Sequence, residues 1–140
     1  MDHIYYFDME TTGIEPRINQ IITIQYAELN IEDLEPLTDL MILKIWETDN
    51  EKNLIKKFID ESNFFNEPFT FIPLGVNVLF DLTFLYKRAK YYGLIDIPYW
   101  KILRDKPFID LKTPLVLMNN LKFKEYDSIV KKNSQVTIHK

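Results

Sequence analysis

The sequence has no cysteine among its 140 residues, which excludes a disulfide framework, a thiolate metal site and a cysteine nucleophile. Glycine occurs only three times, whereas phenylalanine and tyrosine are abundant, which argues against a disordered chain and against a repeat array. No apolar run approaches the roughly 20 residues that a membrane-spanning helix requires, and the opening residues lack the basic region and apolar core of a signal peptide. We therefore expect a cytoplasmic protein with no membrane partner.

The residues that are present suffice for one folded domain. Apolar residues make up 46% of the chain, enough for a sizeable core in a single domain spanning residues 1–140. The formal net charge of −4 argues against a protein that binds nucleic acid through a generally basic surface. It leaves open a nucleic-acid enzyme in which metal ions offset the phosphate charge locally.

Apolar runs early in the chain predict three β-strands joined by short connections: Ile4–Glu10, Gln20–Leu29 and Leu40–Ile45. In the second run, Ile22, Ile24 and Tyr26 alternate with other residues, which places these three side chains on one face of a half-buried strand. The short connections favour an antiparallel meander.

Helical periodicity follows the three strands. Thr48 and Glu51 have the spacing of a capping box, ahead of a helix that should end near Ser62. A fourth strand is expected at Phe69–Leu74, followed by a long helix at Val78–Tyr92. The apolar stripe of the long helix is predicted to comprise Leu79, Leu82, Leu85, Tyr86 and Ala89, and its solvated basic face Lys87, Arg88 and Lys90.

A short fifth strand is expected at Phe108–Asp110, and a helix interrupted by Pro114 at Leu111–Asn120. The order βββαβα, followed by these pieces, predicts the α/β class. We expect a mixed five-stranded sheet flanked by helices.

Two carboxylates stand two residues apart at the end of the first predicted strand. Side chains alternate with period 2 along a strand, so Asp8 and Glu10 point the same way. Like charges this close need a proton or a cation, and paired hard oxygen ligands suit Mg²⁺ or Mn²⁺. A third carboxylate, Asp81, lies among apolar residues in the first turn of the long predicted helix, and Asn77 precedes it by one turn.

Two motifs carry a resemblance to a known family. Phe7–Gly13 (FDMETTG) resembles the first motif of the DEDD, or DnaQ-like, 3′–5′ exonucleases, and Gly75–Asp81 (GVNVLFD) resembles the second. The resemblance extends from Ile4 to about Tyr92 and is greatest to proofreading domains of DNA polymerases and to their stand-alone relatives. It implies a ribonuclease H-like fold. It also implies a two-metal-ion exonuclease that releases nucleoside 5′-monophosphates from the 3′ end of single-stranded DNA or RNA.

The resemblance also implies roles for individual residues. The catalytic residues, which would also be ligands of two Mg²⁺ or Mn²⁺ ions, would be Asp8, Glu10 and Asp81. The substrate-binding residues would be Met9, Thr11, Thr12, Gly13 and Asn77. The implied partner is the 3′ end of a single-stranded nucleic acid, and a polymerase or a repair protein is a further expected partner.

The family has a fourth aspartate that follows a tyrosine or histidine on a C-terminal helix, and this chain departs from that pattern. Tyr126 is followed four residues later by Val130, and Asp127 has the wrong spacing. His139 is placed to begin such a motif, but the sequence stops at Lys140. We therefore expect a truncated C-terminal helix and weak activity in this chain.

Structural alternatives remain open for the candidate residues, and one functional alternative for the chain. The structural uses are a solvated strand end for Asp8 and Glu10, a helix N-terminal charge for Asp81, a helix cap for Asn77, turn formation for Thr11 and Thr12, and a strand-end cap for Asp110. The functional alternative is a truncated or degenerate exonuclease fold that binds nucleic acid or protein without cutting. A ribonuclease H-like endonuclease is poorly supported by the spacing of the first motif.

Overall fold

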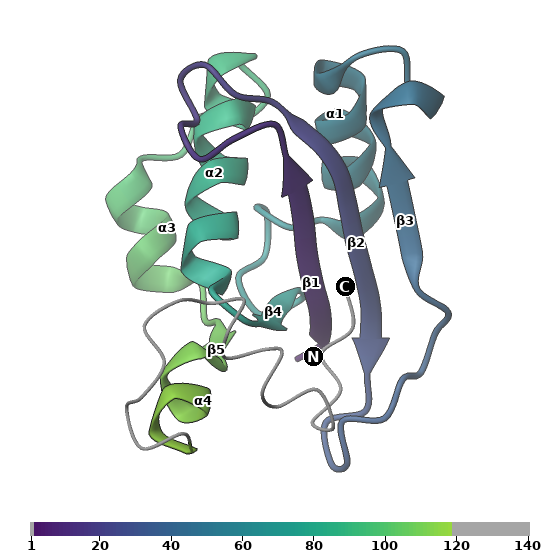
Figure 1. The fold of residues 1–140 in the computed structure, drawn as a ribbon, viewed down its shortest axis with the longest axis vertical. Helices are drawn as coiled ribbons and strands as arrows, with labels where there is room; N and C mark the ends of the chain where they lie inside the picture. Colours follow the sequence, from purple (N-terminus) through teal and green to yellow (C-terminus); the bar gives the residue numbers. More distant parts are fainter. Residues whose placement is uncertain (1, 119–140) are drawn as a thin grey trace.

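The computed structural model describes residues 2–118, and within them five strands form one mixed sheet in the order β3-β2-β1-β4-β5 (Figure 1). The strands are β1 (Ile4–Thr11), β2 (Ile21–Leu29), β3 (Met41–Lys44), β4 (Ile72–Gly75) and β5 (Ile109–Asp110). The helices are α1 (Glu51–Ser62), α2 (Val78–Tyr91), α3 (Tyr99–Asp105) and α4 (Lys112–Met118), and a 3₁₀ turn, η1, spans Ile45–Glu47. The predicted α/β class and the order βββαβα are confirmed.

The first three strands form the predicted antiparallel meander. A β-bulge interrupts the pairing of β1 with β2, because Glu10 lies opposite Thr23 whereas Thr11 lies opposite Ile21. Ile22 is therefore the extra residue, and a bulge breaks the alternation of side chains between the two faces. Ile21 is fully buried and Ile22 only partly, so the predicted position of Ile22 on the buried face is wrong.

β4 pairs parallel with β1, which makes the sheet mixed. The strand begins later than predicted, at Ile72, and Pro73 occupies its second position. A proline lacks the N–H of a ladder hydrogen bond, which explains its place near a strand end. Gly75 lies so close to β1 that a Cβ atom there would sit 2.7 Å from the carbonyl oxygen of Phe7. The pairing of β1 with β4 thus requires glycine at this position.

α1 begins after Asn50, whose side chain accepts a hydrogen bond of 2.8 Å from the backbone N–H of Asn53. Asn50 is therefore the N-cap, and the predicted capping box at Thr48 and Glu51 is wrong. Thr48 donates its hydroxyl to a carbonyl of η1 instead, and Glu51 turns into the interior, with 2% exposure. The helix ends as predicted, with Asn63 in the left-handed conformation.

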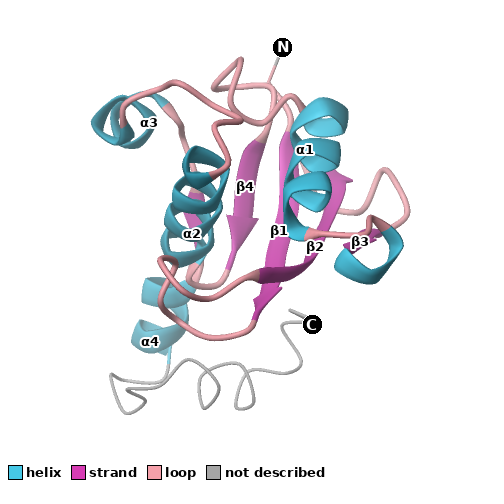
Figure 2. Cartoon of the chain, turned by 90° about the horizontal axis from the view of Figure 1, so that it is seen from above, coloured by secondary structure: helices cyan, strands magenta, loops and turns pink. Residues whose placement is uncertain are grey.

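Figure 2 shows α1 and α2 lying over one face of the sheet. The buried face of α2 carries Leu82 and Leu85 as predicted, but Leu79 is 42% exposed and lines a pocket. Arg88 was expected on a solvated face, and that expectation is wrong. Its side chain is 5% exposed because it forms an ion pair with Glu51 of α1.

Aromatic side chains fill the space between the sheet and these helices. Phe7, Phe58, Phe64 and Phe71 pack with ring centroids 5.0 to 5.8 Å apart. The amine of Lys106 lies against this cluster, 4.0 Å from the centroid of the Phe64 ring, and donates to the backbone carbonyls of Phe64 and Phe71. Burial lowers the pKa of Lys106 to about 7.

The predicted fifth strand is present as β5, one residue shorter than predicted, and the predicted last helix is present as α4, which is described from Lys112 to Met118. Pro114 lies in the first turn of α4, where proline is tolerated. Tyr126, Asp127, His139 and the expected truncated helix lie outside the described residues. Within residues 2–118, no helix has the length and apolar character needed to cross a membrane.

Candidate active site

A pocket of about 200 Å³ lies at the carboxyl ends of the parallel strands β1 and β4. Ligands commonly bind at this edge of open α/β sheets. The pocket is lined by residues of β1, of the β4–α2 connection and of α2: Asp8, Met9, Glu10, Thr11, Val76, Asn77, Phe80 and Asp81. The fold therefore brings the carboxylates of the two sequence motifs to one place.

β1 positions two of the three carboxylates. Phe7 and Met9 point into the aromatic core, so Asp8 and Glu10, which alternate with them, lie on the opposite side of the strand. Asp8 is 6% exposed, whereas Glu10 is exposed, next to the β-bulge that ends the regular pairing with β2. The two predicted ligands thus share a pocket but differ in how firmly packing holds them.

The start of α2 positions the third carboxylate. Asn77 adopts the left-handed conformation (φ 62°) directly before the helix, which asparagine tolerates better than most residues. Its backbone N–H donates to Oδ1 of Asp110 at 2.8 Å, which ties α2 to the end of β5. Asp81 lies in the first turn of α2, is 6% exposed and is favoured there by the helix dipole.

The same contacts decide two structural alternatives. The side chain of Asn77 makes no hydrogen bond to the first turn of α2, so the helix-cap alternative for this side chain is wrong. Asp110 does have the predicted strand-end use, because its Oδ1 also accepts a hydrogen bond of 2.9 Å from the backbone N–H of Lys112.

The carboxylates suit a divalent cation by their chemistry. Asp8 and Asp81 are each 6% exposed and line the same pocket, and Mg²⁺ and Mn²⁺ prefer oxygen ligands such as carboxylates. Across residues 2–118, however, no three Asp, Glu, His or Cys side chains lie close enough together in this structure to hold a metal ion. The roles of Asp8, Glu10 and Asp81 as ligands therefore stay predictions.

The residues Thr11, Thr12 and Gly13 build the turn after β1. The hydroxyl of Thr11 donates to the carbonyl of Gly13 at 2.6 Å, and the hydroxyl of Thr12 accepts from the backbone N–H of Gln20 at 2.9 Å. A Cβ atom on Gly13 would lie 2.5 Å from Oδ1 of Asn19. Turn formation by Thr11 and Thr12 is thus confirmed, and neither Thr12 nor Gly13 lines the first pocket.

A second pocket, of about 330 Å³, adjoins the first and shares Asn77 and Phe80 with it. One wall is Ile14 and Pro16 of the turn after β1, and the other is formed by residues of α2: Leu79, Thr83, Phe84 and Lys87. Sequence reasoning missed this pocket. The available signal was Ile14, an apolar residue next to Gly13 and Pro16 in the predicted connection; in the structure its side chain is 83% exposed.

Solved structures of known proteins share this architecture. Exonuclease I from Methylocaldum szegediense matches 87% of the chain with a TM-score of 0.61 at 21% sequence identity. E. coli exonuclease I in complex with a 5cy-dA13 oligonucleotide matches 84% with a TM-score of 0.59 at 17% identity. An ExoI/SSB-Ct complex matches 91% with a TM-score of 0.56 at 18% identity. The chain has the fold of these exonucleases.

This likeness confirms the predicted ribonuclease H-like fold class, at identities that show the fold alone. The chain spans 30%, 29% and 33% of the lengths of these three structures, respectively. No protein-family model and no curated protein matches the sequence. The activity, the substrate and the partners of this chain therefore rest on its own pocket geometry.

Proposed function

We propose that this chain is the nuclease unit of a 3′–5′ exonuclease that acts on single-stranded nucleic acid with Mg²⁺ or Mn²⁺ as its cofactor. The observation that carries the proposal is the pocket at the ends of β1 and β4, which gathers Asp8, Glu10 and Asp81. The shared fold supports single-stranded DNA in particular, because one of the similar exonucleases was solved with a DNA oligonucleotide.

In this proposal Asp8, Glu10 and Asp81 hold two divalent ions. When bound, such ions lower the pKa of the attacking water and stabilise charge on the leaving 3′ oxygen. Met9 and Thr11 line the same pocket and lie beside the terminal nucleotide, Met9 with its backbone because its side chain packs in the core. The product is a nucleoside 5′-monophosphate. Because Glu10 is exposed, its carboxylate is free of packing constraints that would oppose ligation.

The second pocket extends the site along the bound nucleic-acid strand. Ile14 and Phe80 offer apolar surface to a base, and Lys87 supplies a positive charge for a phosphate. Asn77 lines both pockets and so is placed to orient the strand between them. Thr12 and Gly13 contribute by shaping the turn that carries Ile14.

A second candidate function is binding of single-stranded nucleic acid or of a protein partner without cleavage. Its support is that, within the described part of the chain, no three candidate ligands form a metal-holding group. A polymerase or a repair protein as partner fits either function, and one of the similar exonucleases was itself solved with a bound partner, as an ExoI/SSB-Ct complex.

The test is degradation of 5′-labelled single-stranded DNA and RNA with Mg²⁺ or Mn²⁺. We expect stepwise shortening from the 3′ end by the wild type, abolished by EDTA and reduced at least about a hundredfold in Asp8→Asn and Asp81→Asn. Asp60→Asn, an exposed carboxylate on α1, serves as the control and should cleave like the wild type. Cleavage that persists in Asp8→Asn or in excess EDTA contradicts a metal-dependent mechanism.

A binding measurement separates the two candidate functions. A ligand that binds the folded state raises the thermal midpoint, so Mn²⁺ should stabilise the wild type and Asp60→Asn but neither Asp8→Asn nor Asp81→Asn. Binding of an oligonucleotide without Mn²⁺ stabilisation and without cleavage supports the second candidate.

A further inference from the structure

The turn after β1 is a compact unit with its own hydrogen bonds. The backbone N–H of Thr12 donates to the carbonyl of Gln20 at 2.8 Å and closes the base of the turn. Further along, the backbone N–H of Asn19 donates to the carbonyl of Glu15, also at 2.8 Å. These bonds define the internal shape of the turn, but they do not set its distance from α2.

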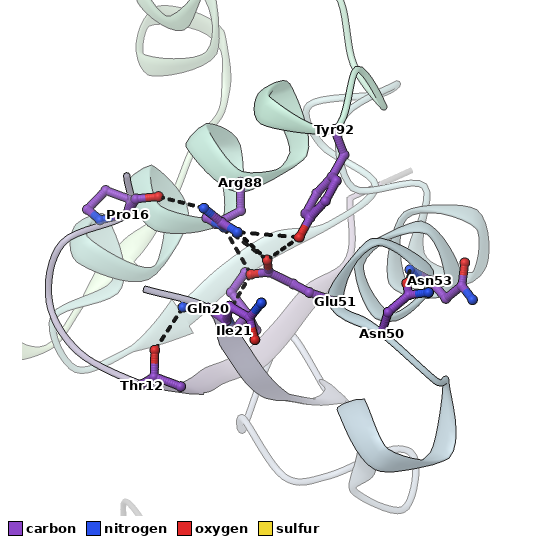
Figure 3. Close-up of polar contacts among 9 residues, drawn as sticks. All are labelled: Thr12, Pro16, Gln20, Ile21, Asn50, Glu51, Asn53, Arg88 and Tyr92. Carbon is purple, nitrogen blue, oxygen red and sulfur yellow. Dashed lines mark hydrogen bonds and ion pairs between the residues drawn. The ribbon is translucent and has the colours of Figure 1, made fainter. Parts of the chain in front are cut away.

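Two contacts from a buried ion pair fix the turn against the helices (Figure 3). Oε2 of Glu51 accepts a hydrogen bond of 2.7 Å from the backbone N–H of Ile21, where the turn enters β2. Nη1 of Arg88 donates to the carbonyl oxygen of Pro16 at 3.1 Å. The pair thereby touches both the end of the turn and its middle.

The guanidinium has a geometry that serves two partners at once. Nε of Arg88 lies 3.1 and 3.0 Å from the two carboxylate oxygens of Glu51, and Nη2 lies 2.5 Å from Oε1. Tyr92 adds a hydrogen bond of 2.7 Å to the same Oε1. The hydrogen bond to Glu51 is the main cause that raises the pKa of Arg88, and Nη1 is left to reach the loop carbonyl.

A buried ion pair is an inefficient way to hold two helices together, because well-packed apolar residues often do so equally well. An apolar pair could not donate to the carbonyl of Pro16. Arg88 follows Phe84 by one helical turn. Its hydrogen bond to the carbonyl of Pro16 therefore connects α2, which forms one wall of the second pocket, to the turn that forms the other wall. The contact spans the two sides that define the width of that pocket.

We infer that Arg88, held by Glu51, is a positioning residue that sets the second pocket by anchoring the turn that carries Ile14 and Pro16. This inference rests on the proposed function, in which that pocket receives a base near the 3′ end. If so, Arg88 touches no substrate, yet it determines how tightly the nucleic-acid strand is bound.

Arg88→Lys is the most informative variant, because lysine keeps the charge beside Glu51 but lacks the fork that reaches two partners. We expect KM for a single-stranded oligonucleotide to rise about tenfold while kcat changes less than about twofold, the pattern of lost binding that is uniform between ground and transition states. Arg17→Lys makes the same exchange at an exposed position on the same turn and should leave KM unchanged.

A double-mutant cycle with Ile14→Ala tests the route of the effect. If Arg88 acts by placing Ile14, the KM increases of Arg88→Lys and Ile14→Ala will be less than multiplicative in the double variant. Multiplicative effects overturn the inference. Phe71→Leu, a core change beside Tyr5 at the other end of β1, controls for general destabilisation, and an equal KM rise in that variant also overturns it.

Hydrogen exchange distinguishes failure of this inference from failure of the proposed function. The amide of Ile21, which donates to Glu51 at the end of the turn, should exchange faster in Arg88→Lys than in the wild type, whether or not the protein cuts nucleic acid. Unchanged exchange overturns the inference. Faster exchange in a protein that neither cuts nor binds oligonucleotides overturns the proposed function and supports the anchoring of the turn by Arg88.

Discussion

The buried amine of Lys106 makes the stability of the fold depend on pH in a defined window. Its side chain is 4% exposed, and burial lowers the pKa of Lys106 from 10.5 to about 7. The amine reaches the backbone carbonyls of Phe64 and Phe71, each of which needs one N–H. A neutral amine still has two N–H groups, so loss of the proton breaks neither hydrogen bond.

The sign follows from the unfolded chain, in which the amine regains its usual pKa. Between pH 7 and 10.5 the unfolded state binds more protons than the folded state, so the free energy of unfolding rises with pH. The full stability is present above the unfolded pKa and is lost as the pH falls toward 7. With these two pKa values, linkage gives a gain of about 2 kcal/mol between pH 7 and pH 9.

Urea unfolding followed by circular dichroism at pH 7, 8 and 9 measures this gain. With a slope of about 2 kcal/mol per molar urea, the wild-type midpoint should rise by about 1 M. Lys106→Met should show no rise, and Lys101→Met, an exposed lysine on α3, should keep it. The window stops at pH 9 because tyrosines of the unfolded chain lose protons near pH 10. A flat wild-type midpoint, or a rise that survives in Lys106→Met, refutes the reasoning.

Two further predictions concern single contacts of the backbone. Gly75→Ala should lower the free energy of unfolding by about 2 kcal/mol, because the new methyl group collides with the carbonyl of Phe7. In the control Gly93→Ala, no atom lies within 4 Å of the new Cβ, so this variant should lose only about 1 kcal/mol, for the strain of its positive φ. Equal losses in urea unfolding would contradict the collision. Asn50→Ala should cost about 1 kcal/mol by removing the cap of α1, and a larger loss in Thr48→Ala than in Asn50→Ala would restore the capping-box interpretation.

Local periodicity predicted most of the fold. The predictions that were wrong concern positions at which contacts with other elements determine the local structure. Period 2 finds the strands, but it cannot place a bulge, because Ile22 becomes the extra residue only when β2 is laid against β1. Thr48 and Asn50 are both good cap residues by type. Asn50 caps α1 because the hydroxyl of Thr48 is already bonded to the carbonyl of Ile45 in η1.

The acidic part of the candidate site could be predicted from the sequence more completely than the apolar part. Alternation along one strand places Asp8 and Glu10 on a common face, and the resemblance to exonucleases joins Asp81 to them. Ile14 and Phe80 come from a turn and a helix whose approach depends on the Arg88 contact to that turn. No local pattern encodes such an approach, so Ile14 could hint at an apolar site in the turn but could not indicate that α2 forms its other wall.

The pairing of Glu51 with Arg88 did leave a signal in the sequence, hidden by its neighbours. Glu51 precedes Leu54 by three residues and Arg88 follows Leu85 by three, so each charge falls on the apolar face of its own helix. Opposite charges on two buried helix faces predict a helix–helix ion pair, because neither is stable there alone. The basic run Lys87–Lys90 obscured this, although Lys87 lies on a different side of the helix. The same logic makes lysine the informative exchange at Arg88, since it preserves the charge that Glu51 requires but removes the guanidinium fork that contacts the turn.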